Sequence, residues 1–225
     1  MFKLKIAAIV GGGMLAYFGY QELQISSNTS SEALPVNLAE LETGEVTLEN
    51  NFIQLNDIWG VTPEMVYYYE YPEGASADDV KPEYKVDYCY LPLISQTHSY
   101  NVACDALIAK YPDGNIPADE EPKFESFAVL LKTNDYKTIG DLPENWLELE
   151  SIEGMVINQI NSFKEDEKTL ILGSFPNLDF DKVLVLEKDR QPSSPVKSYG
   201  MIGGGGLLSI AGLLWLIVGF KKPRE

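Results

Sequence analysis

Few of the side chains on which catalysis usually depends are present in this sequence. Among its 225 residues there are one histidine, His98, and two cysteines, Cys89 and Cys104. Ser95 and Ser99 lie near His98, but no glycine pattern typical of a nucleophile elbow surrounds them. A zinc site at Cys89, His98 and Cys104 would lack a fourth strong ligand and has no CxxC or HxxxH spacing. We therefore expect no catalytic residue and no cofactor; the sequence leans away from an enzyme without excluding one.

Basic residues are scarce as well. The chain has 17 Lys and Arg against 34 Asp and Glu, a net charge of −17. Five of the basic residues and one acidic residue lie in the two terminal segments, which leaves residues 21–198 with 12 basic and 33 acidic side chains, or −21. Nucleic acids need a basic surface, so the composition argues against DNA or RNA as a partner.

The longest stretch without any charge is a run of 22 residues from Tyr199 to Phe220. As a helix it would be about 33 Å long, enough to cross a hydrocarbon core of about 30 Å. The basic residues Lys221, Lys222 and Arg224 follow it directly. Basic residues beside a span mark the cytoplasmic side, so a C-terminal transmembrane helix over 199–220 and a cytoplasmic tail over 221–225 are predicted.

The N-terminus has the same features in the opposite order. Lys3 and Lys5 precede an uncharged stretch from Ile6 to Tyr20, about 22 Å long as a helix. We expect a transmembrane helix or signal anchor over residues 1–22, with a cleaved signal peptide as the alternative. No A-x-A-like cleavage site follows, and either interpretation places the lysines inside and the middle of the chain outside.

Between the two apolar segments the pattern is that of one α+β domain. Residues 23–36 and 191–198 are expected to be linkers, the second rich in Pro and Ser, around an extracytoplasmic domain over 37–190. Strands are expected within 45–57, 64–72, 83–95, 126–133, 148–161 and 180–189, with helices at 38–42, 101–111 and 162–175. The second and third strands form a plausible hairpin, and Gly154 suggests a bulge.

Strands in this order, without regular alternation with helices, favour a curved antiparallel sheet or a partly open barrel with short helices. The acidic residues Glu165, Asp166 and Glu167 are expected on the solvated face of the last helix.

Small residues recur in both apolar segments. Gly12 and Ala16 in the first, and Gly200 and Gly204 in the second, have the small-xxx-small spacing that lets helix backbones approach closely. Three alternatives remain open: the two helices pack on each other, they pack on a partner's helix, or the glycines are merely tolerated.

The two cysteines allow a disulfide in an oxidising compartment. Pairing Cys89 with Cys104 would close a loop of 14 intervening residues and contribute about 3 kcal/mol. Two free thiols are the alternative, because spacing alone does not show that the side chains meet.

A loose set of oxygen ligands follows the second helix. Asp113, Asn115, Asp119 and Glu121 are weak candidates for a calcium site, although the glycine of an EF-hand loop is missing and Pro117 interrupts the pattern. The alternative is a solvated acidic turn.

These patterns predict a protein of the plasma membrane or bacterial inner membrane with two spans, both termini cytoplasmic and its main domain extracytoplasmic. Its expected partners are the lipid bilayer and other membrane proteins. We expect a membrane-anchored binding or scaffolding protein. The alternative is an extracytoplasmic hydrolase or cation-dependent enzyme that uses clustered carboxylates.

Overall fold

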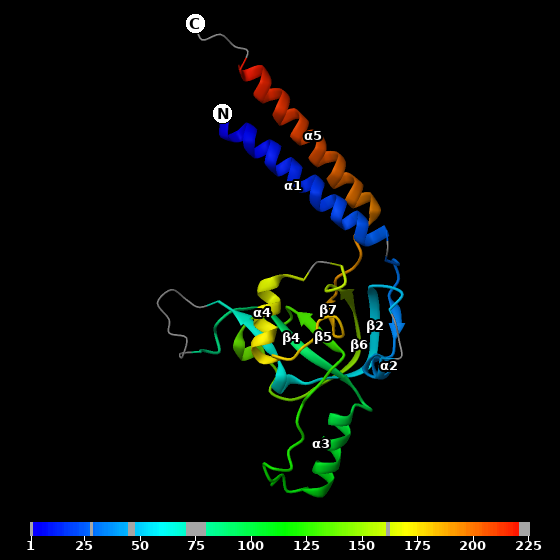
Figure 1. Cartoon of the computed structure of the whole chain (residues 1–225). Helices are drawn as coiled ribbons and strands as arrows, with labels where there is room; N and C mark the ends of the chain where they lie inside the picture. Colours follow the sequence, from blue (N-terminus) through cyan, green and yellow to red (C-terminus); the bar gives the residue numbers. More distant parts are fainter. Residues whose placement is uncertain (1, 28, 45–47, 71–79, 161–162, 221–225) are drawn as a thin grey trace. The chain divides into compact units, whose positions relative to one another are not determined.

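A computed structural model describes residues 2–27, 29–44, 48–70, 80–160 and 163–220 (Figure 1). The chain divides into two compact units. One, the helix pair, consists of residues 1–31 and 191–225, and the other, the barrel domain, consists of residues 32–190. Each unit is described here by itself.

The helix pair contains α1 (Phe2–Ser27) and α5 (Pro195–Phe220), each 26 residues long. The helices are antiparallel, because Gly12 lies against Gly205 whereas Gly19 lies against Met201. Within the described residues, one helix is long and apolar enough to cross a membrane, at Pro195–Val218. Within the same residues α1 does not meet this criterion. The first span therefore rests on the sequence argument alone.

The barrel domain contains seven strands among the described residues. In chain order its elements are β1 (Leu34–Val36), α2 (Leu38–Thr43), β2 (Phe52–Gly60), η1 (Thr62–Glu64), β3 (Val66–Tyr69), β4 (Val86–Ser95), α3 (Ser99–Lys110), β5 (Val129–Thr133), η2 (Ile139–Asp141), β6 (Leu147–Val156), α4 (Glu165–Ser174) and β7 (Leu184–Lys188).

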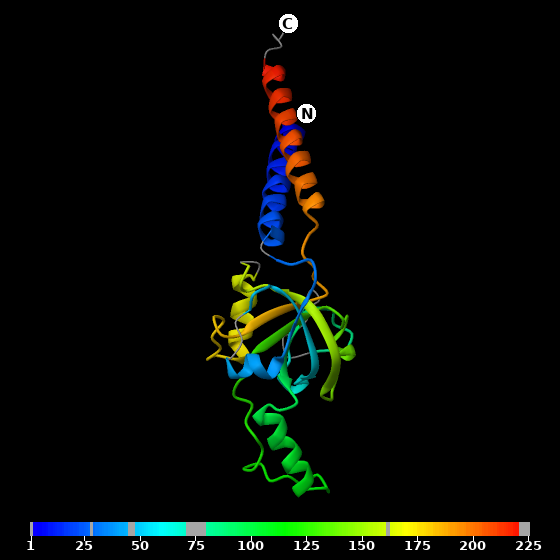
Figure 2. The same cartoon turned by 90° about the vertical axis from the view of Figure 1, so that its right-hand side faces the viewer.

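Five of these strands close into a barrel (Figures 1 and 2). The sheet order is β1-β2-β6-β7-β5-β4-β3, and a further pairing of β2 with β4 joins Ile58 to Ser95 and Gly60 to Leu93. The neighbouring strands β6-β2-β4-β5 have the order 4-1-2-3 of a Greek key when they are numbered along the chain. Small five-stranded Greek-key barrels include the OB-fold, but a strand order alone implies no function.

The barrel differs from the sequence prediction in two respects. It is closed rather than partly open, since β4 is long enough to pair with β3 at its first half and with β2 at its end. The sheet is mixed rather than antiparallel, because β5 and β7 are parallel, as are β1 and β2. The predicted α+β class and the β3–β4 hairpin are confirmed.

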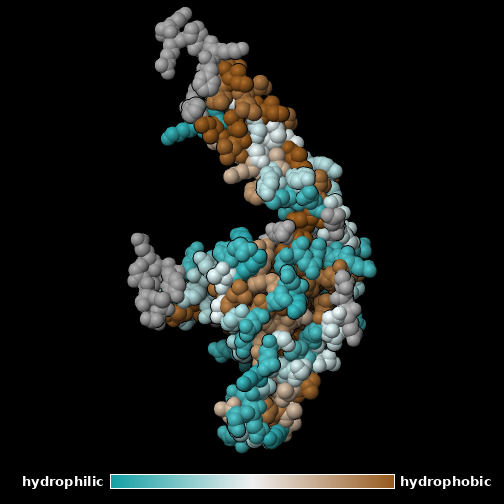
Figure 3. Space-filling view, viewed as in Figure 1, coloured by the Kyte–Doolittle hydropathy of each residue, from teal (hydrophilic) through white to brown (hydrophobic). Residues whose placement is uncertain are grey.

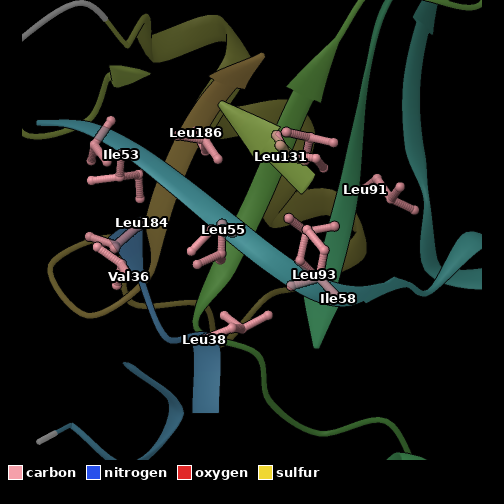
Figure 4. Packing of buried hydrophobic residues seen from close by; sticks show 13 residues of the cluster. Val36, Leu38, Ile53, Leu55, Ile58, Leu91, Leu93, Leu131, Leu184 and Leu186 are labelled. Atoms are coloured by element: carbon pink, nitrogen blue, oxygen red, sulfur yellow. The ribbon is translucent and has the colours of Figure 1, made fainter. Parts of the chain in front are cut away.

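Aliphatic side chains from all five barrel strands fill the interior (Figure 4). Gly154 sits in regular register opposite Ile53, so the expected bulge is absent. A glycine is needed here for another reason: a Cβ at this position would lie 2.3 Å from the Glu187 carbonyl oxygen of β7. The core cluster comprises Val36, Leu38, Ile53, Leu55, Ile58, Leu91, Leu93, Val129, Leu131, Ile152, Val156, Leu184 and Leu186.

Helix α4 is joined to the barrel by a buried polar cluster. Glu167, expected on the solvated face, is only 2% exposed. Its carboxylate accepts a 2.5 Å hydrogen bond from the Tyr90 hydroxyl and pairs with Lys132 Nζ at 2.9 Å. Lys132 Nζ also lies 4.9 Å from the centre of the Tyr88 ring. A buried carboxylate needs such partners, and here they connect α4 to β4 and β5.

Candidate binding groove along helix α3

Helix α3 begins at a histidine cap. The Nδ1 atom of His98 accepts a hydrogen bond from the backbone N–H of Tyr100 at 3.2 Å. The helix ends where the N–H of Tyr111 bonds to the Leu107 carbonyl, and a turn with Gly114 at a φ of 78° follows. The one histidine of the chain therefore has a local structural role at a helix N-terminus.

α3 lies against the barrel only loosely. In both views it extends away from the barrel strands (Figures 1 and 2), and none of its residues is buried. Val102 and Ile108 are 54% and 63% exposed. A helix of this length is marginal in water without tertiary packing, so a helix with apolar side chains and no buried residue is a candidate interaction element.

A groove of about 690 Å³ runs along α3, and we call it the α3 groove. This volume lies in the range typical of sites for small molecules and short side-chain clusters. Its walls come from α3, from β2 and from the loops after α3 and before β6. The lining residues are Trp59, Gln96, Tyr100, Asn101, Cys104, Asp105, Leu107, Ile108, Ile116, Glu121, Pro122 and Trp146.

Stacked aromatic rings form one wall of the α3 groove. Trp146 stacks on Tyr100, with ring centres 5.5 Å apart and planes 14° from parallel. Trp59 meets Trp146 edge-on at 6.5 Å, and Tyr100 contacts Phe124 edge-on at 5.1 Å. Aromatic pairs in these geometries contribute beyond the area they bury, so these ring contacts stabilise the wall although it is partly exposed.

The polar groups of the α3 groove favour positive charge. Its described lining includes the carboxylates Asp105 and Glu121 and no Lys or Arg. The cation at the end of α3, Lys110, forms an ion pair with Glu120, and the Tyr111 hydroxyl donates a 2.8 Å hydrogen bond to the same carboxylate. Lys110 is therefore already paired within the domain.

The thiol in the α3 groove is not activated. Burial raises the pKa of Cys104, and a hydrogen bond with Tyr100 only partly offsets this effect. Burial, followed by the neighbouring Cys104, also raises the pKa of the Tyr100 hydroxyl. A nucleophilic cysteine needs a lowered pKa, so both groups are neutral donors near pH 7.

Cys89 and Cys104 are free thiols in this structure, which corresponds to the second of the two alternatives. Cys89 is buried in β4, where its Sγ lies 3.6 Å from the Thr133 carbonyl oxygen of β5. Cys104 lies on α3, which extends away from the strands. The two side chains thus belong to different surroundings, although only 14 residues separate them.

Ser95 and His98 do not form a catalytic pair. The Ser95 hydroxyl donates a 2.6 Å hydrogen bond to Glu42, whose other carboxylate oxygen accepts from the Ser95 backbone N–H. His98 Nδ1 is occupied by the α3 cap. His98 and Glu42 line a second hollow, and Ser95 does not.

The weak metal candidates are divided between two places. The Asp113 carboxylate accepts hydrogen bonds from the backbone and side chain of Asn115, at 3.4 and 3.0 Å, which stabilise the turn. Glu121 instead lines the α3 groove, and Asp119 is exposed between them. Over the described parts of the chain, no three His, Cys, Asp or Glu side chains are placed to hold a metal ion together.

In the helix pair, Gly12 and Ala16 lie in the contact but Gly200 and Gly204 do not. A Cβ on Gly12 would lie 2.6 Å from the Gly205 carbonyl oxygen, whereas one on Gly200 or Gly204 would meet nothing within 4 Å. Gly205, not Gly204, is therefore the close-contact glycine. Because residues 203–206 are all glycine, the sequence alone does not show which of them faces the partner helix.

The contact of the helix pair repeats with the spacing of a heptad. On α5 it runs through Ser198, Ile202, Gly205, Ser209 and Gly212. On α1 it runs through Ile9, Gly12, Ala16 and Gly19. Alternating steps of three and four residues keep one face toward a partner in a left-handed pair. The Ser209 hydroxyl also donates a 2.9 Å hydrogen bond to the Ile9 carbonyl.

Comparison of the chain with protein-family models, curated proteins and solved structures gives no match. The assignment of a function therefore depends on the geometry of the molecule itself.

Proposed function

We propose that the protein is a membrane-anchored binding protein whose helix pair spans the bilayer and whose barrel domain binds a protein partner through the α3 groove. The observation that carries the binding role is the open aromatic wall of that groove beside a helix without a buried residue. Exposed apolar surface rimmed by polar groups marks interaction sites, and tryptophan and tyrosine dominate binding energy at such sites.

A span at α1 is supported by its match to α5 in length, since each helix has 26 residues. Tyr17 and Tyr20 on α1 lie near the level of Tyr199 on α5, because Gly19 contacts Met201. At the other end Lys5 Nζ donates a 2.8 Å hydrogen bond to the Trp215 carbonyl and lies 5.3 Å from its ring centre. Tyrosine, tryptophan and lysine at both ends are typical of membrane interfaces.

The outer surfaces of both helices also suit lipid. Val10 and Phe18 on α1, and Leu207 and Ile217 on α5, are at least half exposed, and the visible face of the helix pair is largely hydrophobic (Figure 3). In water such a surface would be unfavourable. With the terminal lysines inside, the barrel domain is extracytoplasmic, at the plasma membrane or bacterial inner membrane.

Topology is tested with tags at both ends of the chain. Protease added to intact cells or spheroplasts is expected to digest the barrel domain and leave both tags protected. A mature protein without its N-terminal tag would show a cleaved leader and contradict the two-span anchor. A C-terminal tag that is digested from outside would contradict the orientation.

Binding is tested by photo-crosslinking in native membranes. A photoreactive residue at Ile108, in the α3 groove, is expected to give a discrete adduct, whereas one at Leu172 on α4 serves as the exposed control. The adduct should disappear when Trp146 is replaced by Ala in a chain that still folds. The purified partner should then bind the wild-type chain at least tenfold more tightly than the Trp146→Ala variant. Equal binding to both would refute the groove as the binding surface.

The alternative of a hydrolase or cation-dependent enzyme stays a sequence hypothesis. In the described residues no geometry favours it over binding, since the Ser95 hydroxyl is bound to Glu42 and His98 caps α3.

A further inference from the structure

The chemistry of the α3 groove specifies the kind of segment that would fill it. Its aromatic wall of Trp59, Trp146 and Tyr100 offers a large apolar contact, and its described polar rim carries Asp105 and Glu121 without a cation. An occupant needs apolar side chains to cover the rings and positive charge to match the carboxylates. We infer that the α3 groove binds a protein segment in which leucine-like side chains alternate with Lys or Arg; this inference rests on the binding function proposed above.

Cations are favoured by the rings as well as by the carboxylates. A Lys or Arg head group placed over a tryptophan face is attracted by the ring quadrupole, and partial desolvation strengthens the attraction. The domain already shows this preference, because Lys132 lies 4.9 Å from the Tyr88 ring centre beside the Glu167 carboxylate. A basic residue of a partner would find the same combination of ring and carboxylate in the α3 groove.

A second copy of the chain is disfavoured as the occupant. Residues 21–198 carry a net charge of −21, and the groove carboxylates would face another acidic surface. Like charges opposed across an interface are unfavourable and slow the encounter. A basic apolar segment of a different protein carries the opposite charge, and electrostatic attraction would accelerate its approach to the acidic domain.

Occupancy would also stabilise α3. The helix has 12 residues, none of them buried, and its attachment to the domain includes the Tyr100–Trp146 stack. A partner segment that covers Leu107 and Ile108 would supply the tertiary packing that a short helix lacks. Binding is therefore expected to slow amide hydrogen exchange within α3 and to leave exchange in the barrel strands unchanged.

The test uses the full chain in dodecyl maltoside micelles with Trp215→Phe, so that fluorescence reports Trp59 and Trp146. Three synthetic 12-residue peptides are titrated: an amphipathic one of Leu and Lys, an amphipathic one of Leu and Glu, and a fully polar one of Ser and Lys. We expect the Leu/Lys peptide to bind at least tenfold more tightly than either of the others. The double variant Asp105→Asn/Glu121→Gln should weaken its binding about three- to tenfold.

A matched control separates the groove from the general acidity of the domain. Glu150 and Asp166 are exposed and lie outside the groove, so Glu150→Gln/Asp166→Asn removes the same charge and should leave affinity unchanged. Equal weakening by both double variants would show non-specific attraction and overturn the inference. So would binding of the Leu/Lys peptide that survives Trp146→Ala, which would indicate uptake by the micelle.

The two proposals can fail separately. If the Leu/Glu peptide binds as well as the Leu/Lys peptide and both need Trp146, the groove binds protein segments but the charge preference is wrong. If the Ile108 adduct forms but the Leu/Lys peptide shows no preference over the other two, the chemical class is again wrong and the binding function survives. If neither adduct nor peptide binding depends on Trp146, both proposals fall.

Discussion

The helix pair and the barrel domain are packed by side chains of opposite size. Across the helix pair, Gly12 faces Gly205 so closely that a methyl group on either would overlap backbone atoms. Inside the barrel, the core consists of Leu, Ile and Val that include residues from all five barrel strands. Removal of apolar surface from water stabilises the barrel. In the bilayer proposed for the helix pair that gain would be absent, and small residues would instead allow the backbones close contact.

This contrast predicts opposite rules for substitution. Atoms removed from the barrel core leave a cavity, whereas atoms added to the helix contact force the backbones apart. A small residue is thus the wrong choice in one unit and the required one in the other.

The largest effect is expected for Ile58→Ala in β2. Ile58 is fully buried in the barrel core, so the lost methyl groups and the resulting cavity should lower the free energy of unfolding by about 2–5 kcal/mol. Urea unfolding followed by near-UV circular dichroism measures this loss. A change below about 1 kcal/mol would show that the barrel core is not closely packed.

A smaller effect is expected for Gly205→Leu in α5. A Cβ at this position would lie 2.5 Å from the Gly12 carbonyl oxygen, and overpacking typically costs about 1–3 kcal/mol. The readout is a disulfide between Gly13→Cys and Ser209→Cys, because a Cβ on Gly13 would lie 3.9 Å from the Ser209 side-chain oxygen and would make no closer contact. Its yield should fall with Gly205→Leu.

Gly204→Leu is the matched control, because nothing lies within 4 Å of its Cβ position. Its disulfide yield should equal that of the parent pair. Equal loss with both leucines would mean that the helices contact each other through a different face.

The smallest effect comes from ionisation of the thiols, which does not change the free energy of unfolding near pH 7. Burial raises the pKa of Cys89 to about 12, so its protonated form is the one favoured by folding. The contribution of this thiol to the free energy of unfolding is fully present below pH 9 and is lost as the pH rises from about 9 to about 12.

At pH 8 a thiol reagent should label Cys104, which is partly exposed, and spare Cys89. Mass spectrometry of digested protein identifies the labelled peptide, and a linked Cys89–Cys104 peptide would contradict two free thiols.

Local structure could be predicted from the sequence where one residue determines it. The short helix expected at 38–42 is found as α2, where Asn37 Oδ1 accepts the Ala39 N–H at 3.0 Å and Gly44 ends the helix with a φ of 73°. The helix expected at 101–111 is found as α3. These features depend on neighbouring residues only.

Features that join distant segments could not be predicted in this way. Barrel closure depends on the pairing of β2 with the end of β4, and β1 was hidden in a segment assigned to a linker. The burial of Glu167 depends on Tyr90, which lies 77 residues earlier in the chain. An acidic triplet on a helix carries no signal for such a partner.

The α3 groove was missed for the same reason, since Trp59 lies in β2 whereas Trp146 lies in the loop just before β6. One signal was nevertheless available, because α3 carries Val102 and Ile108 on different faces. A helix that is apolar on more than one side but too short to be a span is expected to need a second contact.

The hydrogen bond from Ser209 to Ile9 also has a consequence for synthesis. It joins positions 200 residues apart, and a ribosome adds about 5–20 residues per second. The contact face of α1 therefore waits about 10–40 s before its complement exists. During this interval the barrel domain can fold, while α1 has not yet made its contact with α5. Helix α5 thus completes a contact face that was translated about 200 residues earlier.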